Sequence, residues 1–300
     1  MNSSYKAILA SFSTWADTLG YADETKRSFE YVVNDFLQWL ENRRITSITR
    51  LTSSHVTDYF HYVETRPNKH FEWRLLSASQ LNHHFYATDK FLEFLHQHGM
   101  ENAPAPENRR IKINEQERIE KIKVLTQQEI KTLHDSIPNT YRHLNFEARQ
   151  AKHYELKLIF ALYYGCGLRL SEGCRLCVHE VDFDKKTVFV KQGKNYKDRI
   201  IPMNSGVYNA LRDYVYNFRH KLKLDHNRLF IIGKNAIFER LKDLQKKCED
   251  EAIRAKRINI HLLRHSIATH LLQNGMSIEN ISLFLGHAKL DTTQLYTHLI

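Results

Sequence analysis

Five basic residues and one tyrosine in the second half of the chain have the types and the order needed for chemistry on a phosphodiester. They are Arg169, Lys194, His261, Arg264, His287 and Tyr296. Cationic groups can balance the charge of a pentacovalent phosphorane, and a tyrosine hydroxyl can supply the oxygen nucleophile. On a helix, His261 and Arg264 would share one face because they are three residues apart. The set predicts a site that acts on a backbone phosphate.

Each of these residues has a simpler interpretation when it is taken alone. An HxxR pair often occurs by chance, and a histidine after a helix-ending glycine is usually a solvated turn residue. Lys191 and Lys197 lie near the same predicted hairpin as Lys194 and compete with it for the role of an acid. His265 would point about 100° away from Arg264 around a helix, so we expect it to pack or to face a phosphate.

The basic charge is concentrated in the part of the chain that carries these residues. The 300 residues have a formal net charge of +10, and the sequence pI is about 9.3. Residues 1–105 hold ten Lys and Arg against twelve Asp and Glu, so the excess lies beyond them. Basic side chains gain affinity for a polyanion by displacing its condensed counterions. The sequence therefore predicts a nucleic-acid partner for the second part of the chain.

The composition, with 42% hydrophobic and 26% charged residues, is typical of a globular protein. No apolar stretch reaches the length of about 18 residues that a membrane span needs. The N-terminal residues also lack the basic and apolar regions of a signal peptide. We therefore expect a cytoplasmic, nucleoid-associated protein without a membrane partner.

A metal site at the cysteines has to be weighed against core packing. Cys174 and Cys177 form a CxxC pair with His179 nearby, but a structural zinc site usually has two such pairs. The two cysteines could also share the buried side of a helix with Leu168 and Leu170, where free cysteine packs as a small apolar residue. We predict core packing and, since no Asp/Glu cluster stands out, neither a metal nor another cofactor.

The first third of the chain predicts a helical domain. Apolar residues recur at helical spacing in four segments of residues 5–98, and no strand pattern interrupts them. Asp23 is expected to cap the second helix. We therefore predict a compact four-helix domain over residues 1–102. Alternating prolines in Ala103–Pro106, followed by a polar stretch, predict an extended linker over residues 103–124.

Residues 125–300 predict a larger domain that is mainly helical. Thr126 and Glu129 have the spacing of a capping box, which marks the start of its first helix. Segments 181–184, 187–190 and 199–202 have the pattern of short strands. The fold class expected for the whole chain is mainly α, with a small antiparallel β-sheet and with Lys194 in the turn between its second and third strands.

Together, these segments resemble the tyrosine recombinase (phage integrase) family of Xer-like and Cre-like site-specific recombinases. In that family, an Arg in an LRxSE segment, a Lys in a β-hairpin, an HxxR pair, a His in LGH and a Tyr about nine residues later make the active site. The matching segments here are Leu168–Glu172, Gly193-Lys194, His261 to Arg264, Leu285–His287, and Tyr296 nine residues after His287. The resemblance covers about residues 126–296 and implies that the four-helix start is the family's SAM-like core-binding domain.

The resemblance implies a site-specific DNA recombinase or integrase that needs neither metal nor ATP. Tyr296 would attack a backbone phosphate and form a 3′-phosphotyrosine, which conserves the energy of the phosphodiester. Arg169 and Arg264 would each donate two N–H groups to the non-bridging oxygens, and His287 would add another donor.

By the same analogy, His261 helps to take the tyrosine proton, and Lys194 protonates the leaving 5′ oxygen. The implied partners are specific double-stranded recombination sites, a homotetramer of the protein on DNA and accessory DNA-bending proteins. Relatives commonly donate a C-terminal helix to a neighbouring subunit. Only four residues follow Tyr296 here, so we expect subunit contacts to come largely from elsewhere.

Two other functions compete with this interpretation. A type IB topoisomerase has similar chemistry, but it would act as a monomer without a specific site, and the four-helix start favours a recombinase. A non-catalytic DNA-binding accessory protein on the same scaffold would be expected to have lost catalytic residues, whereas all six positions of the pattern are filled.

Overall fold

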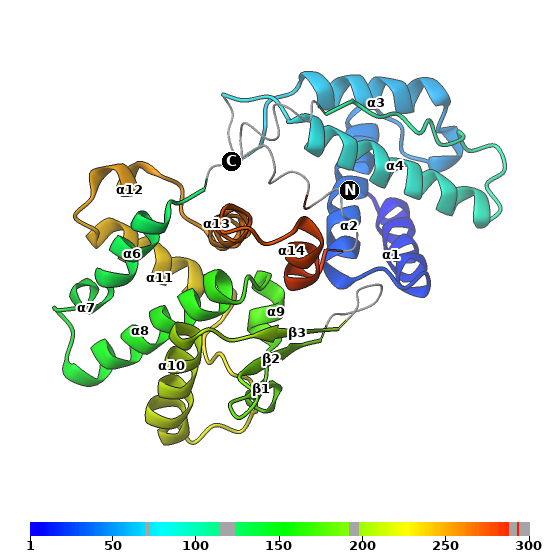
Figure 1. Cartoon of the computed structure of the whole chain (residues 1–300). Coiled ribbons are helices and arrows are strands. Elements are labelled where there is room, and N and C mark those ends of the chain that lie inside the picture. The colour runs from blue at the N-terminus through cyan, green and yellow to red at the C-terminus, as the bar shows by residue number, and fades with distance from the viewer. Residues whose placement is uncertain (70–72, 114–123, 192–197, 288–292, 294–300) are drawn as a thin grey trace. The chain divides into compact units, whose positions relative to one another are not determined.

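The computed structural model describes residues 1–69, 73–113, 124–191, 198–287 and 293. The chain divides into two compact units, Met1–Glu115 and Gln116–Ile300 (Figure 1). Each unit has its own hydrophobic core. Both units are mainly helical, and one three-stranded sheet occurs within the described ranges, in the second unit. The predicted fold class is confirmed.

Four helices form the body of the first unit, as predicted: α1 (Ser3–Thr18), α2 (Asp23–Asn42), α3 (Ser53–Thr65) and α4 (Ala78–Gln97). The prediction that Asp23 caps α2 was wrong. Asp23 is the first helical residue and Ala22 stands at the cap. The Asp23 carboxylate pairs with Lys26 at 3.0 Å instead, and as a negative charge in the first turn it still favours the helix.

The segment expected as a linker is bound, up to Ile111, to the first unit. The Asn82 amide donates to the Ile111 carbonyl at 2.9 Å, and its oxygen accepts from the Ile111 N–H at 2.8 Å. The buried Asp89 carboxylate accepts from the Glu107 N–H at 3.0 Å. These bonds satisfy backbone groups that an extended chain cannot pair with itself, so this stretch is part of the first unit.

The helices of the second unit are α6 (Gln127–Asp135), α7 (Ile137–Thr140), α8 (Phe146–Ile159), α9 (Leu170–Arg175), α10 (Ser205–Asp213), α11 (Lys234–Lys247), α12 (Glu251–Ala255), α13 (Ile260–Gln273) and α14 (Ile278–Leu285). A π-helix, Phe160–Gly165, continues α8. The predicted capping box is confirmed, because Thr126 Oγ1 accepts from the Glu129 N–H and Glu129 accepts from the Thr126 N–H.

The sheet has the order β1 (Val181–Asp182), β2 (Thr187–Val190) and β3 (Arg199–Pro202), with antiparallel neighbours. β1 is two residues shorter than expected because Asp182 Oδ1 accepts the Lys185 N–H at 2.8 Å and starts the turn. Residues alternate along β3, so that Arg199 and Ile201 are buried and Ile200 is exposed.

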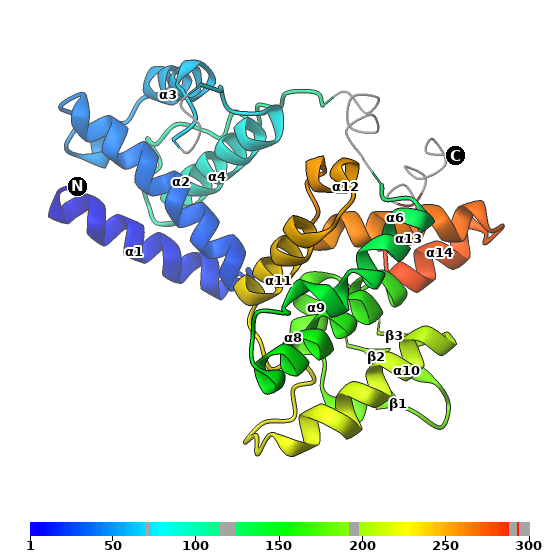
Figure 2. The ribbon, with the colours of Figure 1, turned by 90° about the vertical axis from the view of Figure 1, so that its left-hand side faces the viewer.

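α13 and α14 pack next to each other in the second unit. α13 contacts α14, and α14 contacts β3; the orange and red ribbons lie side by side in both views (Figures 1 and 2). Gly286 ends α14 in the left-handed conformation, with φ 67°. Ser277 caps the start of α14, since its hydroxyl accepts from the Asn280 N–H.

The cysteine prediction was correct only in part. Cys166 is buried and Cys174 packs at the edge of the core. Cys177 is not on the buried face of a helix, because α9 ends at Arg175 and the backbone is extended at Leu176. In the described ranges, no group of three or more His, Cys, Asp and Glu could hold a metal ion. No described helix is long and apolar enough to cross a membrane.

Candidate active site

The last turn of α14 presents backbone carbonyls to three arginines. The His287 N–H donates to the Ser282 carbonyl at 3.0 Å, and the Gly286 N–H donates to the Leu283 carbonyl at 3.1 Å. This closing arrangement leaves the carbonyls of residues 284–286 pointing beyond the helix. The partial negative charge at a helix C-terminus attracts cations, so the end of α14 is suited to hold guanidinium groups.

Each of these successive carbonyls accepts from a different arginine: Phe284 from Arg199 Nε at 2.9 Å, Leu285 from Arg264 Nη2 at 2.8 Å, and Gly286 from Arg169 Nη2 at 2.7 Å. The three arginines come from β3, from α13 and from the start of α9. Segments far apart in the sequence are therefore joined at one helix end.

Arg264 is buried, and its position depends on a glycine. Its Nη1 donates to the Gly167 carbonyl, and 5% of the residue is exposed. Gly167 has a φ of +59°, and a Cβ there would lie 2.8 Å from a methyl group of Leu285. Only glycine allows the loop before Arg169 to approach α14 so closely without strain. That approach lets one guanidinium bridge the loop and the helix.

Glu172 lies between two of the arginines. Its carboxylate accepts from Arg169 Nη1 at 2.7 Å and from Arg199 Nη2 at 2.8 Å. It also accepts from the Arg169 N–H at 2.8 Å, at the start of α9. Burial opposes the ionised carboxylate, but the hydrogen bonds and charge of Arg199, with those of Arg169, lower its pKa to about 2. Glu172 therefore remains ionised and fixes both side chains.

His287 is half-buried beside the arginines. Its Nδ1 lies 2.8 Å from the Thr293 hydroxyl. Burial lowers the pKa of His287 to about 3, and the charges of Arg264 and Arg169 act in the same direction. A neutral imidazole at pH 7 presents one N–H donor and one acceptor. His265 also lowers this pKa, so His265 belongs to the electrostatic surroundings of the site.

The structure brings together three of the six predicted residues: Arg169, Arg264 and His287. His261 is exposed in the first turn of α13, one turn before Arg264. Lys194 and Tyr296 lie outside the described residues.

Comparison with known proteins identifies the family. The profile described as "Phage integrase family" matches residues 123–300. The chain belongs to the phage integrase family. The match covers the whole second unit apart from its first residues, and therefore every element that holds the arginine cluster.

Similar proteins include tyrosine recombinases of Thermococcus species. Tyrosine recombinase XerA of Thermococcus onnurineus (strain NA1) is 34% identical over 180 residues, which are 58% of this chain and 57% of the relative. XerA of Thermococcus kodakarensis is 28% identical over 97% of this chain and 90% of its own. Among the relatives that are more than 30% identical, the chain spans about half of the relative's length.

A solved structure shows the same fold. The XerH site-specific recombinase, in a post-cleavage complex with a palindromic difH substrate, has a TM-score of 0.70 at 16% identity. The similarity covers 91% of this chain and 76% of that one. The helical second unit with its small sheet is thus the fold that a phage integrase family member is expected to have.

Sequence reasoning missed Arg199, which the structure places in the arginine cluster at the end of α14. Arg199 is 9% exposed and holds Glu172 with two N–H groups. The available signal was its position two residues before Ile201, on the same face of β3. That signal is ambiguous, because Ile200 made the opposite face an equally good candidate for the core.

Proposed function

We propose that this phage integrase family member is a site-specific DNA recombinase that cleaves and rejoins duplex DNA through a 3′-phosphotyrosine intermediate. The observation that carries the proposal is the cluster at the end of α14. There Arg169 and Arg264 donate to successive carbonyls, directly before His287. The order and types of the other predicted residues support the same reaction.

The cluster supplies electrostatic stabilisation that exists before DNA binds. Backbone carbonyls and Glu172 fix the guanidinium planes of Arg169 and Arg264. Positive groups that are already oriented need little reorganisation when charge develops on the phosphorane. In the proposed reaction, both arginines and the neutral His287 donate hydrogen bonds to the non-bridging oxygens.

The covalent steps are assigned to three further residues, Tyr296, His261 and Lys194. The Tyr296 oxygen attacks the phosphorus and displaces the 5′ oxygen of the next nucleotide, so one P–O bond forms as another breaks. His261 assists removal of the tyrosine proton, and Lys194 gives a proton to the leaving oxygen. Attack by the freed 5′ hydroxyl of the partner strand reverses the step and releases Tyr296.

We also propose the partners that such a reaction needs. The substrate is double-stranded DNA with specific recombination sites, and a homotetramer of the protein exchanges the strands. Accessory DNA-bending proteins assist the reaction, and the protein is associated with the nucleoid. In this assignment, the first unit, predicted as residues 1–102 and extended by the bound stretch up to Ile111, is the core-binding domain, and residues 125–300 form the catalytic domain. Support comes from the net charge of +10 and from the family match.

The decisive experiment uses the proposed nucleophile. Genomic DNA fragments that bind the Tyr296→Phe protein identify a site, and a nicked oligonucleotide with that site is incubated with each variant. We expect the unaltered protein and the control Tyr216→Phe, at an exposed tyrosine, to form a covalent complex that survives denaturation. The Tyr296→Phe protein should form none. A persistent complex with Tyr296→Phe would refute the nucleophile, and relaxation of plasmids without a site by monomers would favour a topoisomerase.

A further inference from the structure

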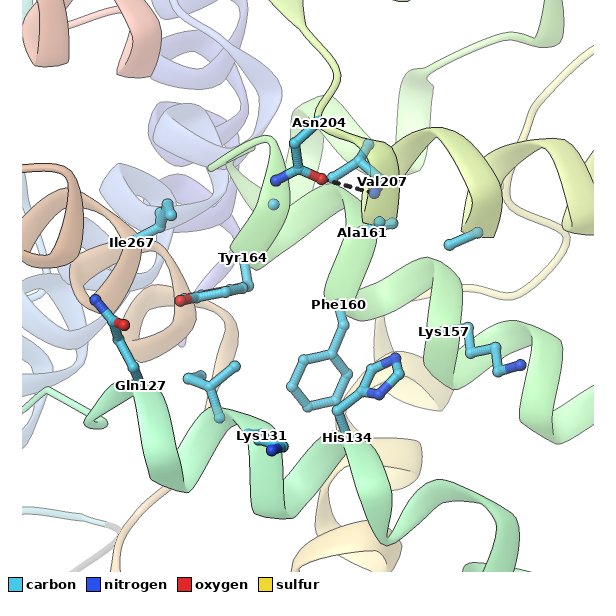
Figure 3. Close-up of a pocket in the computed structure, with 14 residues that line it drawn as sticks. Gln127, Lys131, His134, Lys157, Phe160, Ala161, Tyr164, Asn204, Val207 and Ile267 are labelled. Atoms are coloured by element: carbon cyan, nitrogen blue, oxygen red, sulfur yellow. Dashed lines mark hydrogen bonds between the residues drawn. The ribbon is translucent and has the colours of Figure 1, made fainter. Parts of the chain in front are cut away.

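A pocket of about 470 Å³ lies in the second unit, and none of Arg169, Arg199 and Arg264 is among the residues that line it (Figure 3). Its walls come from α6, the end of α8, the π-helix Phe160–Gly165, α10 and α13. Sites for small organic ligands usually measure about 300–1,000 Å³. The pocket therefore has the size of a ligand site, and nothing in the proposed recombination reaction uses it.

The inner surface of the pocket is apolar. Phe160 and Ala161 of the π-helix line it together with Ile130 of α6, Val207 of α10 and Ile267 of α13. Gly165 allows this geometry, since a methyl group there would collide with the Val207 side chain. π-Helices are rare and are frequently found at functional sites. The surface is suited to an apolar chain.

The rim of the pocket carries positive charge. Lys131 and Lys157 line it together with His134, and no Asp or Glu is among the lining residues (Figure 3). The Asp135 carboxylate, 3.9 Å from His134, does not line the pocket. Burial lowers the pKa of His134, and Lys157 acts in the same direction despite the opposing effect of Asp135. An anionic head group at this rim would meet lysine ammonium groups and no carboxylate of the lining residues.

We propose that this pocket binds a small amphipathic anion, with an apolar chain against the π-helix and a carboxylate or phosphate group at Lys131 and Lys157. The bound chain would touch the two segments that lead to the arginine cluster. Gly165 precedes Arg169 by four residues, and Ile267 follows Arg264 by three. The proposal does not depend on the DNA reaction.

The test uses the full chain with labelled isoleucine methyl groups and decanoate, decyl phosphate or decanol as probes. We expect decanoate or decyl phosphate to shift the Ile130 and Ile267 signals and to leave buried Ile48 of the first unit unchanged. The anion that binds more tightly identifies the head group. Decanol should bind about tenfold more weakly, since it lacks the charge-assisted bonds to lysine. Equal affinities for decanol and both anions would overturn the assignment of an anion.

Variants separate this site from non-specific binding. Ala210→Trp, on the pocket side of α10, should abolish the shifts, whereas Asn209→Trp, on the exposed side, should preserve them. Lys131→Gln and Lys157→Gln should each weaken anion binding, and the control Lys246→Gln, at an exposed residue of α11, should not. The proposal fails if neither anion shifts the two isoleucines at millimolar concentration. It also fails if Ala210→Trp changes only the oligomeric state, which would assign the pocket to contacts between copies of the chain.

Discussion

Replacing Glu172 with glutamine tests how the arginine cluster is held together. The Glu172 side chain is 4% exposed, and that of its partner Arg199 is 7% exposed. Glutamine keeps the shape of the side chain but removes the negative charge between Arg169 and Arg199. The substitution leaves a buried cation without its counter-charge, which is costly in a region shielded from water.

The size of the effect follows from the pKa of Glu172, which falls from 4.5 to about 2 in the folded protein. At about 1.4 kcal/mol for each tenfold change in proton affinity, this fall corresponds to roughly 3 kcal/mol of stability at pH 7. Breaking a buried ion pair typically costs about 3–5 kcal/mol, which agrees with this figure. Because the folded pKa is depressed, this stabilisation is complete above pH 4.5 and is lost as the pH falls towards 2.

The assay must report on the second unit. All three tryptophans, Trp15, Trp39 and Trp73, lie in the first unit, so their fluorescence reports mainly on its unfolding. Hydrogen exchange of the α13 amides follows the second unit instead. We expect Glu172→Gln to lower its opening free energy by about 3 kcal/mol at pH 7, with little change for the exposed control Glu239→Gln. Parallel loss of stability in parent and variant between pH 4.5 and 2 would refute the reasoning.

Three further predictions concern the same cluster. Gly167→Ala should destabilise the second unit by more than Gly275→Ala. Alanine at either position must adopt a left-handed backbone, which costs about 1–2 kcal/mol, but only at Gly167 would its methyl group also collide with Leu285. Equal losses of stability in a denaturation assay would contradict this contact. Arg264→Lys should slow covalent complex formation by about 10²-fold or more, since lysine cannot bridge the Gly167 and Leu285 carbonyls while facing a phosphate. Near-normal rates would argue against a role for the two-pronged guanidinium of Arg264. The His287 pKa of about 3 predicts that its Cε1–H resonance does not titrate near pH 6.5 in the free protein. It also predicts that the stability of the folded protein falls as the pH drops from 6.5 towards 3, because only the unfolded histidine binds a proton in that range. A titration midpoint near 6.5 would exclude the buried neutral form.

Local patterns in the sequence were sufficient to predict where helices form and which residue types the candidate site would contain. Helical spacing of apolar residues and the Thr126–Glu129 capping box depend on neighbours a few positions apart, so they can be read without a tertiary structure. Asp23 shows the limit of such patterns. A carboxylate beside a helix start can cap it or pair with Lys26, and the choice depends on geometry that the spacing does not contain.

The sequence alone determined that the chain carries the ordered residues of a phage integrase family member in a basic, mainly helical second part. Only the tertiary structure decided how they are held: Arg169 bonds to Gly286, 117 residues away, and Arg264 bonds to Gly167, 97 residues away. It also decided that Arg199 joins them and that His287 is neutral. The physical reason is that the acceptors are carbonyls at the end of α14, which any residue type can supply. Such backbone groups leave no mark in the sequence, so their partners are known only once the chain has folded.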